Sequence, residues 1–310
     1  MGKRALITGA AGQDGTWLAA QLIDAGWTVF GVVHPLLAVE NIRLKAVLPA
    51  VEQLPASVAD LESVSAAFTV AQPDCIWHLA AIASPADCEK NRTRAIDTNI
   101  LGTLNVLLMA QSYGASVIFA STNDAMYARG EAASTYAITK RTAHDLVVQF
   151  RERDGLAATN AVLWNHTSPM QGTDYILPKI ARAAVDASID GAVTEFRASL
   201  DSTIDISHAQ DVTRALLKLA DGKPGDYEVG SGVALSLAMY CRLAFDHVGI
   251  HDRDWRELVR WPAEATPTQA RPADTSKLRE LGWAPDWTGK AVMEALVDEA
   301  AIRRRAEVRA

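Results

Sequence analysis

Short apolar runs alternate with longer amphipathic segments through the first half of the chain. The apolar runs are often β-branched, which is typical of strands buried on both faces. They lie at Ala5–Thr8, Thr28–Val33, Cys75–Leu79, Ser116–Ser121 and Ala158–Trp164. The segments between them repeat their apolar positions at helical spacing, at Trp17–Ala25, Leu61–Val70, Ala95–Tyr113 and Thr135–Arg153. Strands that alternate with helices pair in parallel through right-handed crossovers, so the pattern predicts an α/β fold with a doubly wound parallel sheet.

The rhythm changes after about Asn165, where shorter strands mix with helices. The predicted strands are Thr194–Ala198, Ile204–Ser207 and Tyr227–Gly230, and the predicted helices are Leu177–Asp190, His208–Asp221 and Leu235–Val248. We therefore predict a first domain over residues 1–165 that holds the parallel sheet, and a smaller C-terminal lobe over residues 166–310. Helix 208–221 is the element of the second half that could also pack on the first domain.

The charge balance excludes some classes of partner. Lys and Arg total 30 against 37 for Asp and Glu, which gives a formal net charge of −7. Nucleic-acid binding needs a basic face, so we expect no nucleic-acid partner. Cys75, Cys88 and Cys241 fit neither a disulfide framework nor a zinc site, so we expect no metal. With no signal-like segment and no apolar run long enough for a membrane span, we expect a cytoplasmic protein without membrane attachment.

A glycine-rich turn follows the first predicted strand and opens the first predicted helix: Thr-Gly-Ala-Ala-Gly-Gln-Asp-Gly, residues 8–15. Glycines permit a tight turn, close approach of the backbone to a pyrophosphate and close packing of helix on strand. The helix N-terminus then offers free N–H groups and a partial positive charge to phosphates. This strand–turn–helix context predicts a dinucleotide-binding (Rossmann) domain over residues 1–165. The expected cofactor contacts in the turn are Gly9, Ala11, Gly12, Gln13 and Asp14.

The end of the second strand bears on the choice between NAD and NADP. Residues 31–35 are Gly-Val-Val-His-Pro, without the acidic residue that would bind the adenosine ribose of NAD. Arg43 could instead meet a 2′-phosphate, which favours NADP with NAD possible; Arg43 as a solvated helix residue is an equal alternative. Asp60, followed by Leu61, could contact the adenine or could equally cap the next helix.

A tyrosine and a lysine stand four residues apart in the predicted helix Thr135–Arg153. This spacing places Tyr136 and Lys140 on one helix face. A phenol has a pKa near 10 and is a poor base at neutral pH, but a neighbouring ammonium favours the phenolate. Tyr136 could then accept a hydroxyl proton during oxidation of the same carbon. After a glycine-rich turn and a strand that ends in Ser121-Thr122, the pair predicts oxidoreductase chemistry.

These features together resemble the extended short-chain dehydrogenase/reductases, and within them the GDP-mannose 4,6-dehydratase family. The resemblance covers essentially the whole chain. The glycine-rich turn with its Gln-Asp pair and the segment Trp-Asn-His-Thr-Ser-Pro at 164–169 are its most specific parts. The other matching segments are Ala120-Ser121-Thr122, the Tyr136/Lys140 pair, Lys179, Arg271-Pro272 and Leu-Gly-Trp-Ala-Pro at 281–285.

The resemblance implies a three-step reaction on a nucleotide-activated sugar, with a GDP-hexose favoured. Tyr136 and NADP would oxidise C4, with Thr122 bonded to the reacting oxygen and Lys140 beside the phenol. Asp124 would remove the C5 proton so that water leaves from C6, and the stored hydride would return to C6. Further cofactor contacts are expected at Leu61, Leu79, Ala80, Ala81, Tyr136 and Lys140, and substrate contacts at Ser84, Asn123, Asn165, Lys179 and Arg271. The lobe over residues 166–310 would bind the nucleotide sugar.

The resemblance also implies a homodimer built from the two long helices Ala95–Tyr113 and Thr135–Arg153. Their outer faces are predicted to carry more apolar residues than one sheet face needs, so two copies could form a four-helix interface. These residues are Leu104, Leu107, Leu108, Leu146, Val147 and Phe150.

The chain departs from the family pattern near the predicted base. The family has Glu where this chain has Asp124, which is one methylene shorter, and Asn123 cannot donate a proton as an acid. The stretch Ala125–Ser134 is shorter than the corresponding family loop, and Ile204 replaces a family Arg. A C4 ketoreductase or 4-epimerase of the same fold is therefore a second hypothesis. A non-catalytic dinucleotide-binding partner protein is a third, from another class, although such a protein would not need Thr122, Tyr136 and Lys140 together.

Several other polar residues have ordinary structural explanations. His78 lies inside an apolar run and is expected to be a hydrogen-bonded core histidine. Asp201, Asp205, His208 and Asp211 lack the spacing of a metal site and are expected to be turn and cap residues.

Overall fold

The computed structural model describes residues 2–36, 44, 49–127, 133–173, 175–251, 255–262 and 264–309. The chain divides into two compact units. The first unit comprises Met1–Leu163, Val212–Val229 and Ser276–Trp283, and the second comprises Trp164–Asp211, Gly230–Thr275 and Ala284–Ala310.

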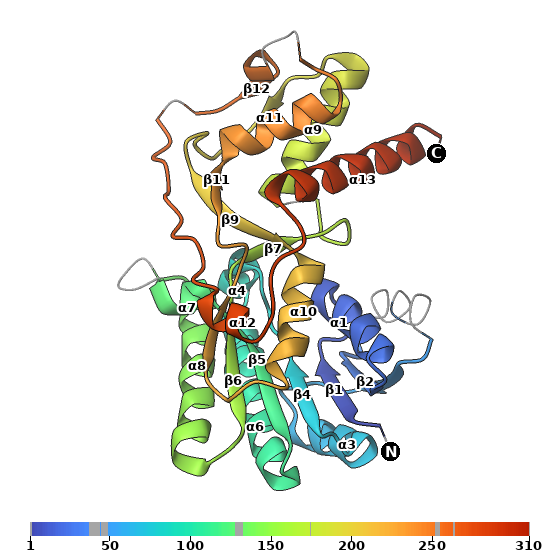
Figure 1. The fold of residues 1–310 in the computed structure, drawn as a ribbon, viewed down its shortest axis with the longest axis vertical. Helices are drawn as coiled ribbons and strands as arrows, with labels where there is room; N and C mark the ends of the chain where they lie inside the picture. The colour runs from blue at the N-terminus through green and yellow to red at the C-terminus, as the bar shows by residue number, and fades with distance from the viewer. Residues whose placement is uncertain are drawn as a thin grey trace. The chain divides into compact units, whose positions relative to one another are not determined.

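A seven-stranded sheet organises the first unit (Figure 1). Its order is β10-β6-β5-β4-β1-β2-β3, and every neighbouring pair is parallel. The strands are β1 (Arg4–Thr8), β2 (Thr28–Val33), β3 (Glu52–Pro55), β4 (Cys75–His78), β5 (Ser116–Thr122), β6 (Ala158–Leu163) and β10 (Asp226–Val229). The predicted doubly wound parallel sheet is confirmed.

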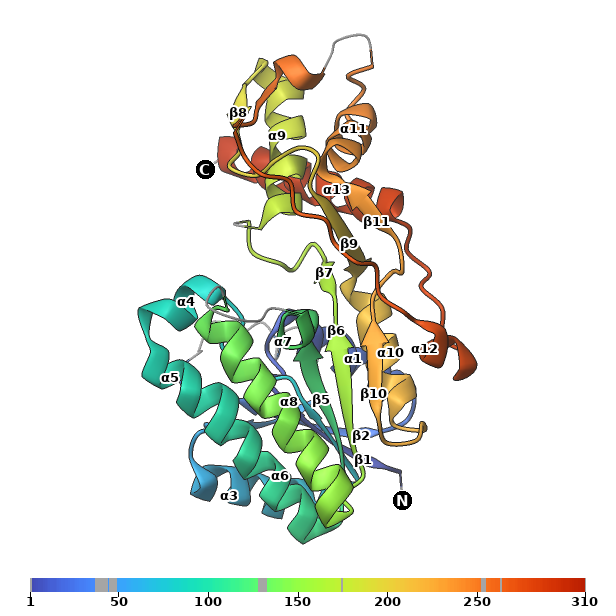
Figure 2. The ribbon, with the colours of Figure 1, turned by 90° about the vertical axis from the view of Figure 1, so that its left-hand side faces the viewer.

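Helices cover both faces of this sheet, which explains why β4 and β6 are buried at every position. One face packs against α1 (Gln13–Asp24), α10 (Ala209–Leu219) and α12 (Ser276–Glu280). The other packs against α3 (Leu61–Ala71), α6 (Gly102–Tyr113) and α8 (Thr135–Asp154), which lie side by side in Figure 2.

Several element predictions need correction. The strand predicted at Tyr227–Gly230 in the second lobe is β10, which pairs with β6 in the large sheet because α10 returns the chain to that sheet. The first helix begins at Gln13, directly after the glycine turn, rather than at Trp17. The segment Ala95–Tyr113 is interrupted: α5 (Arg92–Ile96) leads into a π-helical turn, Asp97–Leu101, before α6. The edge strand β3 and the short helix α4 (Pro85–Lys90) were not predicted.

The second unit has its own sheets and core. Strands β7 (Asn165–Thr167), β9 (Thr203–His208) and β11 (Ala234–Ser236) form a mixed three-stranded sheet, and β8 (Thr194–Glu195) pairs with β12 (Val259–Arg260). The helices are α9 (Ile176–Asp190), α11 (Leu237–His247), α13 (Gly289–Arg309) and a 3₁₀ turn at Trp255–Glu257. The three long helices bury an apolar cluster that includes Ile180, Tyr240, Phe245 and Met293.

The apolar residues predicted on the outer faces of the long helices are partly misplaced. Leu107, Val147 and Phe150 are buried against the large sheet, because these helix faces point inward. The large apolar side chains exposed on these neighbouring helices are Ile96, Leu101, Leu108 and Ile138. Within the described ranges, no helix combines the length and apolar character needed to cross a membrane.

Candidate functional site

The strand order of the large sheet reverses between β1 and β4. In open α/β sheets ligands bind beyond the carboxyl ends of the strands at such a point. The glycine turn at residues 9–12 follows β1, and Leu79–Ala81 follow β4, so the two segments meet at this edge of the sheet.

The glycine turn is shaped so that side chains would not fit. Gly9 has φ +73°, and a Cβ there would lie 2.9 Å from the amide nitrogen of Ala80. A Cβ on Gly15 would lie 2.6 Å from Cα of Ala10, so α1 packs directly on the turn. The amide of Gly12 donates to the carbonyl of Gly9 (3.1 Å), and Gly12 caps α1 without a side-chain bond to its first N–H groups. This backbone cradle fits a dinucleotide pyrophosphate.

A buried histidine braces the two segments. Thr103 Oγ1 donates to the carbonyl of Asn99 (2.7 Å) and therefore accepts from His78 Nε2 (3.1 Å). His78 Nδ1 then accepts from Thr8 Oγ1 (2.7 Å), which itself accepts from the amide of Ala80 (3.2 Å). Burial lowers the pKa of His78 to about 3, so the ring is neutral. The prediction of a hydrogen-bonded core histidine is confirmed.

The two residues considered for adenosine recognition have different outcomes. Asp60 caps α3, since its carboxylate accepts from the amides of Glu62 (3.2 Å) and Ser63 (3.3 Å). The capping alternative is therefore observed, while a further contact with adenine stays a prediction. Arg43 lies outside the described residues. Leu61 begins α3 and is exposed.

The helix α8 carries the predicted Tyr136/Lys140 pair and begins at a well-defined position. Ser134 is its N-cap and accepts from the amide of Ala137 (3.1 Å). The carboxylate of Glu89, on α4, accepts from the amide of Thr135 (2.7 Å). Two acceptors thus occupy N–H groups that a helix leaves free at its start, and they fix the turn that carries Tyr136.

Lys140 is held beneath the end of β5. Its side chain is only 4% exposed, its Nζ donates to the carbonyl of Ala120 (2.5 Å), and the ammonium lies 4.2 Å from the ring centroid of Phe119. Burial lowers the pKa of Lys140 to about 7. Lys140 therefore gains and loses its proton near neutral pH. In its charged form it can stabilise a phenolate at Tyr136, a half-buried residue of the same helix.

The end of β5 leads directly into the short helix α7 (Asn123–Tyr127). Thr122 Oγ1 donates to Asn123 Oδ1 and accepts from the amide of Asp124, both at 3.3 Å. Asp124 is exposed to solvent, and partial desolvation of its carboxyl raises its pKa above that of an ordinary aspartate. A carboxyl in this state can both take and return a proton.

Sequence reasoning missed Asn99, which ties the β4 edge to α8. Its Nδ2 donates to the carbonyl of Ile82 (3.2 Å) and to Thr139 Oγ1 (3.0 Å), and its Oδ1 accepts from the amide of Ile82 (2.8 Å). Thr139 Oγ1 in turn donates to the carbonyl of Tyr136 (3.0 Å). Asn99 lies in the π-helical turn, a feature often found at functional sites. An amide inside an apolar helical segment was the signal that could have identified it.

A serine, a histidine and an aspartate also form a chain in this unit, but its serine is inaccessible. Ser121 Oγ lies 2.9 Å from His144 Nδ1, and His144 Nε2 lies 3.4 Å from Asp226. Ser121 is only 2% exposed, so it cannot meet a substrate carbonyl. The chain of polar groups joins β5, α8 and β10.

The predicted substrate residues are divided between the units. Ser84, in the first, is the N-cap of α4 and accepts from the amide of Asp87. Asn165 and Lys179, in the second, are exposed. Arg271, in the same unit, has its guanidinium 5.9 Å from the centroid of the Trp164 ring, and Trp164 Nε1 donates to its carbonyl (2.9 Å).

A buried carboxylate holds the segment after Arg271. Asp205, on β9, accepts from the amides of Ser231 (2.9 Å), Gly232 (3.0 Å) and Ala273 (2.9 Å), and from the hydroxyl of Ser231 (2.6 Å). Asp211 accepts from the amide of Trp287 (2.9 Å) and His208 stacks on the Trp287 ring. These are structural roles, as predicted. The described part of the chain contains no cluster of three or more His, Cys, Asp or Glu suited to a metal ion.

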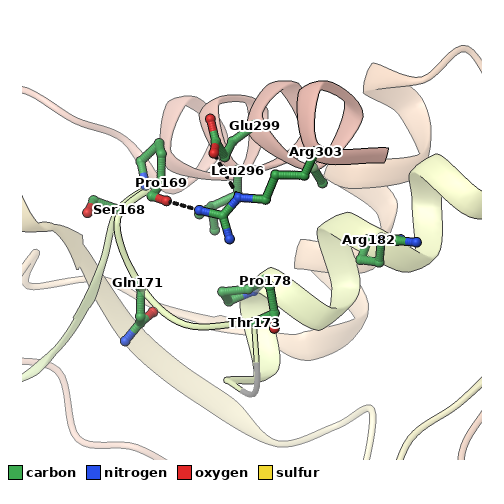
Figure 3. Close-up of a pocket in the computed structure, with 10 residues that line it drawn as sticks. Ser168, Pro169, Gln171, Thr173, Pro178, Arg182, Leu296, Glu299 and Arg303 are labelled. Atoms are coloured by element: carbon green, nitrogen blue, oxygen red, sulfur yellow. Dashed lines mark hydrogen bonds and ion pairs between the residues drawn. The ribbon is translucent and has the colours of Figure 1, made fainter. Parts of the chain in front are cut away.

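A small depression in the second unit lies between α9, α13 and residues 168–173 (Figure 3). Arg303 crosses it, with Nη2 donating to the carbonyl of Pro169 (2.6 Å) and Nε to Glu299 (2.8 Å). The depression has a free volume of about 30 Å³, which holds only a few waters, so it does not accommodate a nucleotide sugar.

Comparison with known proteins assigns the chain to a family. The chain is 28% identical to GDP-mannose 4,6 dehydratase 1 of Arabidopsis thaliana, over 96% of this chain and 89% of that protein. A Thermus thermophilus UDP-glucose 4-epimerase complexed with NAD has a similar structure, with TM-score 0.80 and 22% identity, over 96% of this chain and 98% of that one. The structure of RMD from Pseudomonas aeruginosa complexed with NADPH has TM-score 0.76 and 21% identity, over 97% of this chain and 100% of that one. The sequence model for GDP-mannose 4,6 dehydratase matches residues 6–296, and the chain therefore belongs to this family.

Proposed function

We propose that the protein is a nucleotide-sugar 4,6-dehydratase that acts on a GDP-hexose and retains NADP through turnover. The observation that carries the proposal is the set of groups at the end of β5 and along α8: a hydroxyl (Thr122), a carboxylate with raised pKa (Asp124), a half-buried phenol (Tyr136) and a buried lysine (Lys140). Membership of the GDP-mannose 4,6 dehydratase family supports this choice of reaction.

The cofactor would lie against Gly9, Ala11, Gly12 and the segment Leu79–Ala81, where the glycine turn packs closely on Ala80 and the N-terminus of α1 begins. Gln13, Asp14 and Asp60 are proposed to contribute further contacts. When bound, a nicotinamide would supply the redox chemistry: it would take a hydride from C4 and return it to C6, while C5 takes a proton from solvent in place of the one removed. Neighbouring structures hold NAD in one case and NADPH in another, and the absence of an acidic residue at positions 31–35 favours NADP.

The side chains would divide the proton transfers among them. Tyr136 takes the proton of the C4 hydroxyl, with Thr122 bonded to the same oxygen and Lys140 stabilising the phenolate. Asp124 then removes the C5 proton, which the C4 ketone acidifies. Because Asn123 cannot act as an acid, Asp124 would deliver that proton to the departing C6 hydroxyl, and one water is lost. A raised pKa suits a carboxyl that must be base and then acid.

Ser84 and Asn123 are proposed to contact the sugar. Asn165, Lys179 and Arg271 are proposed to contact the nucleotide, with the two cations matched to phosphate charge.

A second candidate, a C4 ketoreductase or 4-epimerase, keeps the same cofactor but needs no C5 base. The short side chain of Asp124 favours it, because Asp is one methylene shorter than the Glu of the family and has less reach to a C5 proton. The structural similarity to a UDP-glucose 4-epimerase is compatible with this alternative.

One experiment tests the proposal directly. The protein is incubated with NADP and a panel of GDP-, UDP- and dTDP-hexoses without added reductant. The molecular masses of the products are then measured by mass spectrometry. A dehydratase yields a product lighter by one water, with a GDP-hexose as best substrate. A product of unchanged mass but altered configuration would favour the epimerase.

A further inference from the structure

We propose that Arg141 is a positioning residue that clamps α7 onto the catalytic helix and thereby holds Asp124 in place for proton transfer. Arg141 directly follows Lys140 on α8. Its Nε donates to the carbonyl of Ala125 (2.7 Å), and its Nη2 donates to the same carbonyl and to that of Met126 (3.2 Å). The inference rests on the proposed function for the role of Asp124.

The hydrogen bonds from Arg141 stabilise α7, which is too short to be stable alone. This helix has only five residues, Asn123–Tyr127, and so short a helix is not stable by itself. Its last carbonyls have no partners within the helix, and a cation near a helix C-terminus also interacts favourably with the helix dipole. The guanidinium supplies both the donors and the charge from a neighbouring helix.

The two ends of α7 are thus held in different ways. At its start, the amide of Asp124 donates to Thr122 Oγ1, which belongs to the end of β5. At its end, Arg141 binds two consecutive carbonyls. Asp124 is itself the first attachment and directly precedes the second, so movement of its backbone requires breaking one of them.

Arg141 connects the helix that carries Asp124 to the helix that carries Tyr136 and Lys140. One residue step turns about 100° around a helix, so Lys140 and Arg141 leave α8 in different directions. Lys140 reaches the carbonyl of Ala120 on β5, while Arg141 reaches α7. A single helix therefore fixes the base proposed for C4 oxidation, its lysine, and the segment that carries the base proposed for elimination.

The fork of the guanidinium distinguishes this role from a general effect of charge. Lysine keeps the charge but presents one compact ammonium that cannot bind both carbonyls in the same geometry. Methionine keeps much of the chain length and removes both the charge and the donors. Arg153, exposed in the last turn of α8, offers a matched control for loss of an arginine from the same helix.

The test compares Arg141→Met, Arg141→Lys and Arg153→Met in the full chain. Amide hydrogen exchange, followed by mass spectrometry, needs no substrate. Residues 123–127 should exchange roughly tenfold faster or more in Arg141→Met, less so in Arg141→Lys, while residues 140–150 and Arg153→Met stay as in wild type. Unchanged exchange at 123–127, or equally faster exchange along α8, overturns the proposal.

Kinetics with NADP and the nucleotide sugar identified for the wild type then test the consequence. Stopped-flow nicotinamide absorbance should show C4 oxidation within a few-fold of wild type in Arg141→Met, while loss of water slows on the order of a hundredfold. Equal slowing of both steps, or no slowing of elimination, overturns the positioning role. If the wild type dehydrates no sugar, the proposed function fails, and the exchange result still decides whether Arg141 holds α7.

Discussion

Lys140 donates a 2.5 Å hydrogen bond to the carbonyl oxygen of Ala120, and this bond joins α8 to the strand that ends in Thr122. The lysine is almost fully buried, and burial lowers its pKa from 10.5 to about 7. Burial of an ammonium therefore costs stability wherever the lysine is charged in the folded protein, and this cost gives the protein a measurable pH dependence.

The stability contribution of Lys140 should rise with pH between about 7 and 10.5. In that window the unfolded chain binds the proton that the folded chain has lost, so the free energy of unfolding increases with pH. Comparison of wild type with Lys140→Met by urea unfolding should show a difference that changes by up to about 2–3 kcal/mol between roughly pH 7 and pH 9.

At the upper end of this pH range, two buried thiols have the opposite effect on the free energy of unfolding. Burial raises the pKa of the Cys75 and Cys241 thiols from 9.0 to about 12. Above about pH 9 the unfolded chain loses thiol protons that the folded chain keeps, so these thiols favour the folded state less as the pH rises. Both are present in wild type and variant, and the difference cancels them. A difference that is flat with pH would show that Lys140 does not titrate in this window.

Tyr136→Phe should abolish C4 oxidation and leave NADP binding nearly intact. The phenol oxygen is needed to take the hydroxyl proton, whereas the ring preserves packing. Loss of a general base typically slows a reaction about a hundred- to ten-thousand-fold. Stopped-flow absorbance of reduced nicotinamide measures the step, and fluorescence titration measures cofactor affinity. A rate within a few-fold of wild type would assign the base to another residue.

Large parts of the first unit follow from the sequence, because its signals are local. Apolar runs give the buried strands, and the glycine turn needs only its own backbone and the neighbouring Ala80. The edge strand β3 was not predicted, since Glu-Gln-Leu-Pro at 52–55 has no apolar run and none of its residues is fully buried. The partner of β10 could not be predicted, because strand character does not say which sheet a strand joins.

The supporting contacts of the site could not be derived in this way. Asn99 and Thr139 are distant in the chain, and their bond depends on how the π-helical turn packs against α8. The sequence position of Arg141 indicates an ordinary surface cation, whereas in the structure it binds backbone carbonyls of α7. The inward direction of Leu107 likewise depends on helix rotation, which the π-helical turn shifts.

The protein should bind NADP roughly tenfold or more tightly than NAD. Residues 31–35, at the end of β2, include no acidic residue to bind a ribose 2′-hydroxyl, and Arg43 is proposed to pair with the 2′-phosphate through a charge-assisted hydrogen bond. Arg43→Ala should weaken NADP binding and leave NAD binding unchanged, as measured by calorimetric titration of both cofactors. Equal affinities in the wild type would remove Arg43 from the proposed site.

A homodimer is expected to form through α5, α6 and α8, with the exposed side chains in place of the buried ones first considered. Ile96, Leu108 and Ile138 lie on these helices and are 48%, 40% and 54% exposed. The double substitution Leu108→Glu and Ile138→Glu should place charges in the interface and produce a monomer in sedimentation velocity. Ile302→Glu, at a site 61% exposed on α13, is the matched control and should stay dimeric. A monomeric wild type at micromolar concentration contradicts the prediction.

Asp124 distinguishes the two candidate reactions. If the enzyme is a dehydratase, Asp124→Asn should block elimination but permit C4 oxidation, because the amide cannot take the C5 proton. Enzyme-bound reduced nicotinamide should then accumulate on mixing with substrate. Asp124→Glu, which restores the carboxylate on a longer chain, is the control and should retain elimination.

The pH dependence of the same step carries independent information. Partial desolvation raises the pKa of Asp124, so its carboxylate is lost at a higher pH than that of an ordinary aspartate as the solution is acidified. The rate of elimination should therefore fall in acid earlier than a free aspartate would predict, while C4 oxidation keeps its own profile. Solvent deuterium entering C5 of the product identifies the step. Full turnover by Asp124→Asn, without deuterium at C5 in the wild-type product, would contradict the dehydratase and leave C4 redox chemistry as the better account.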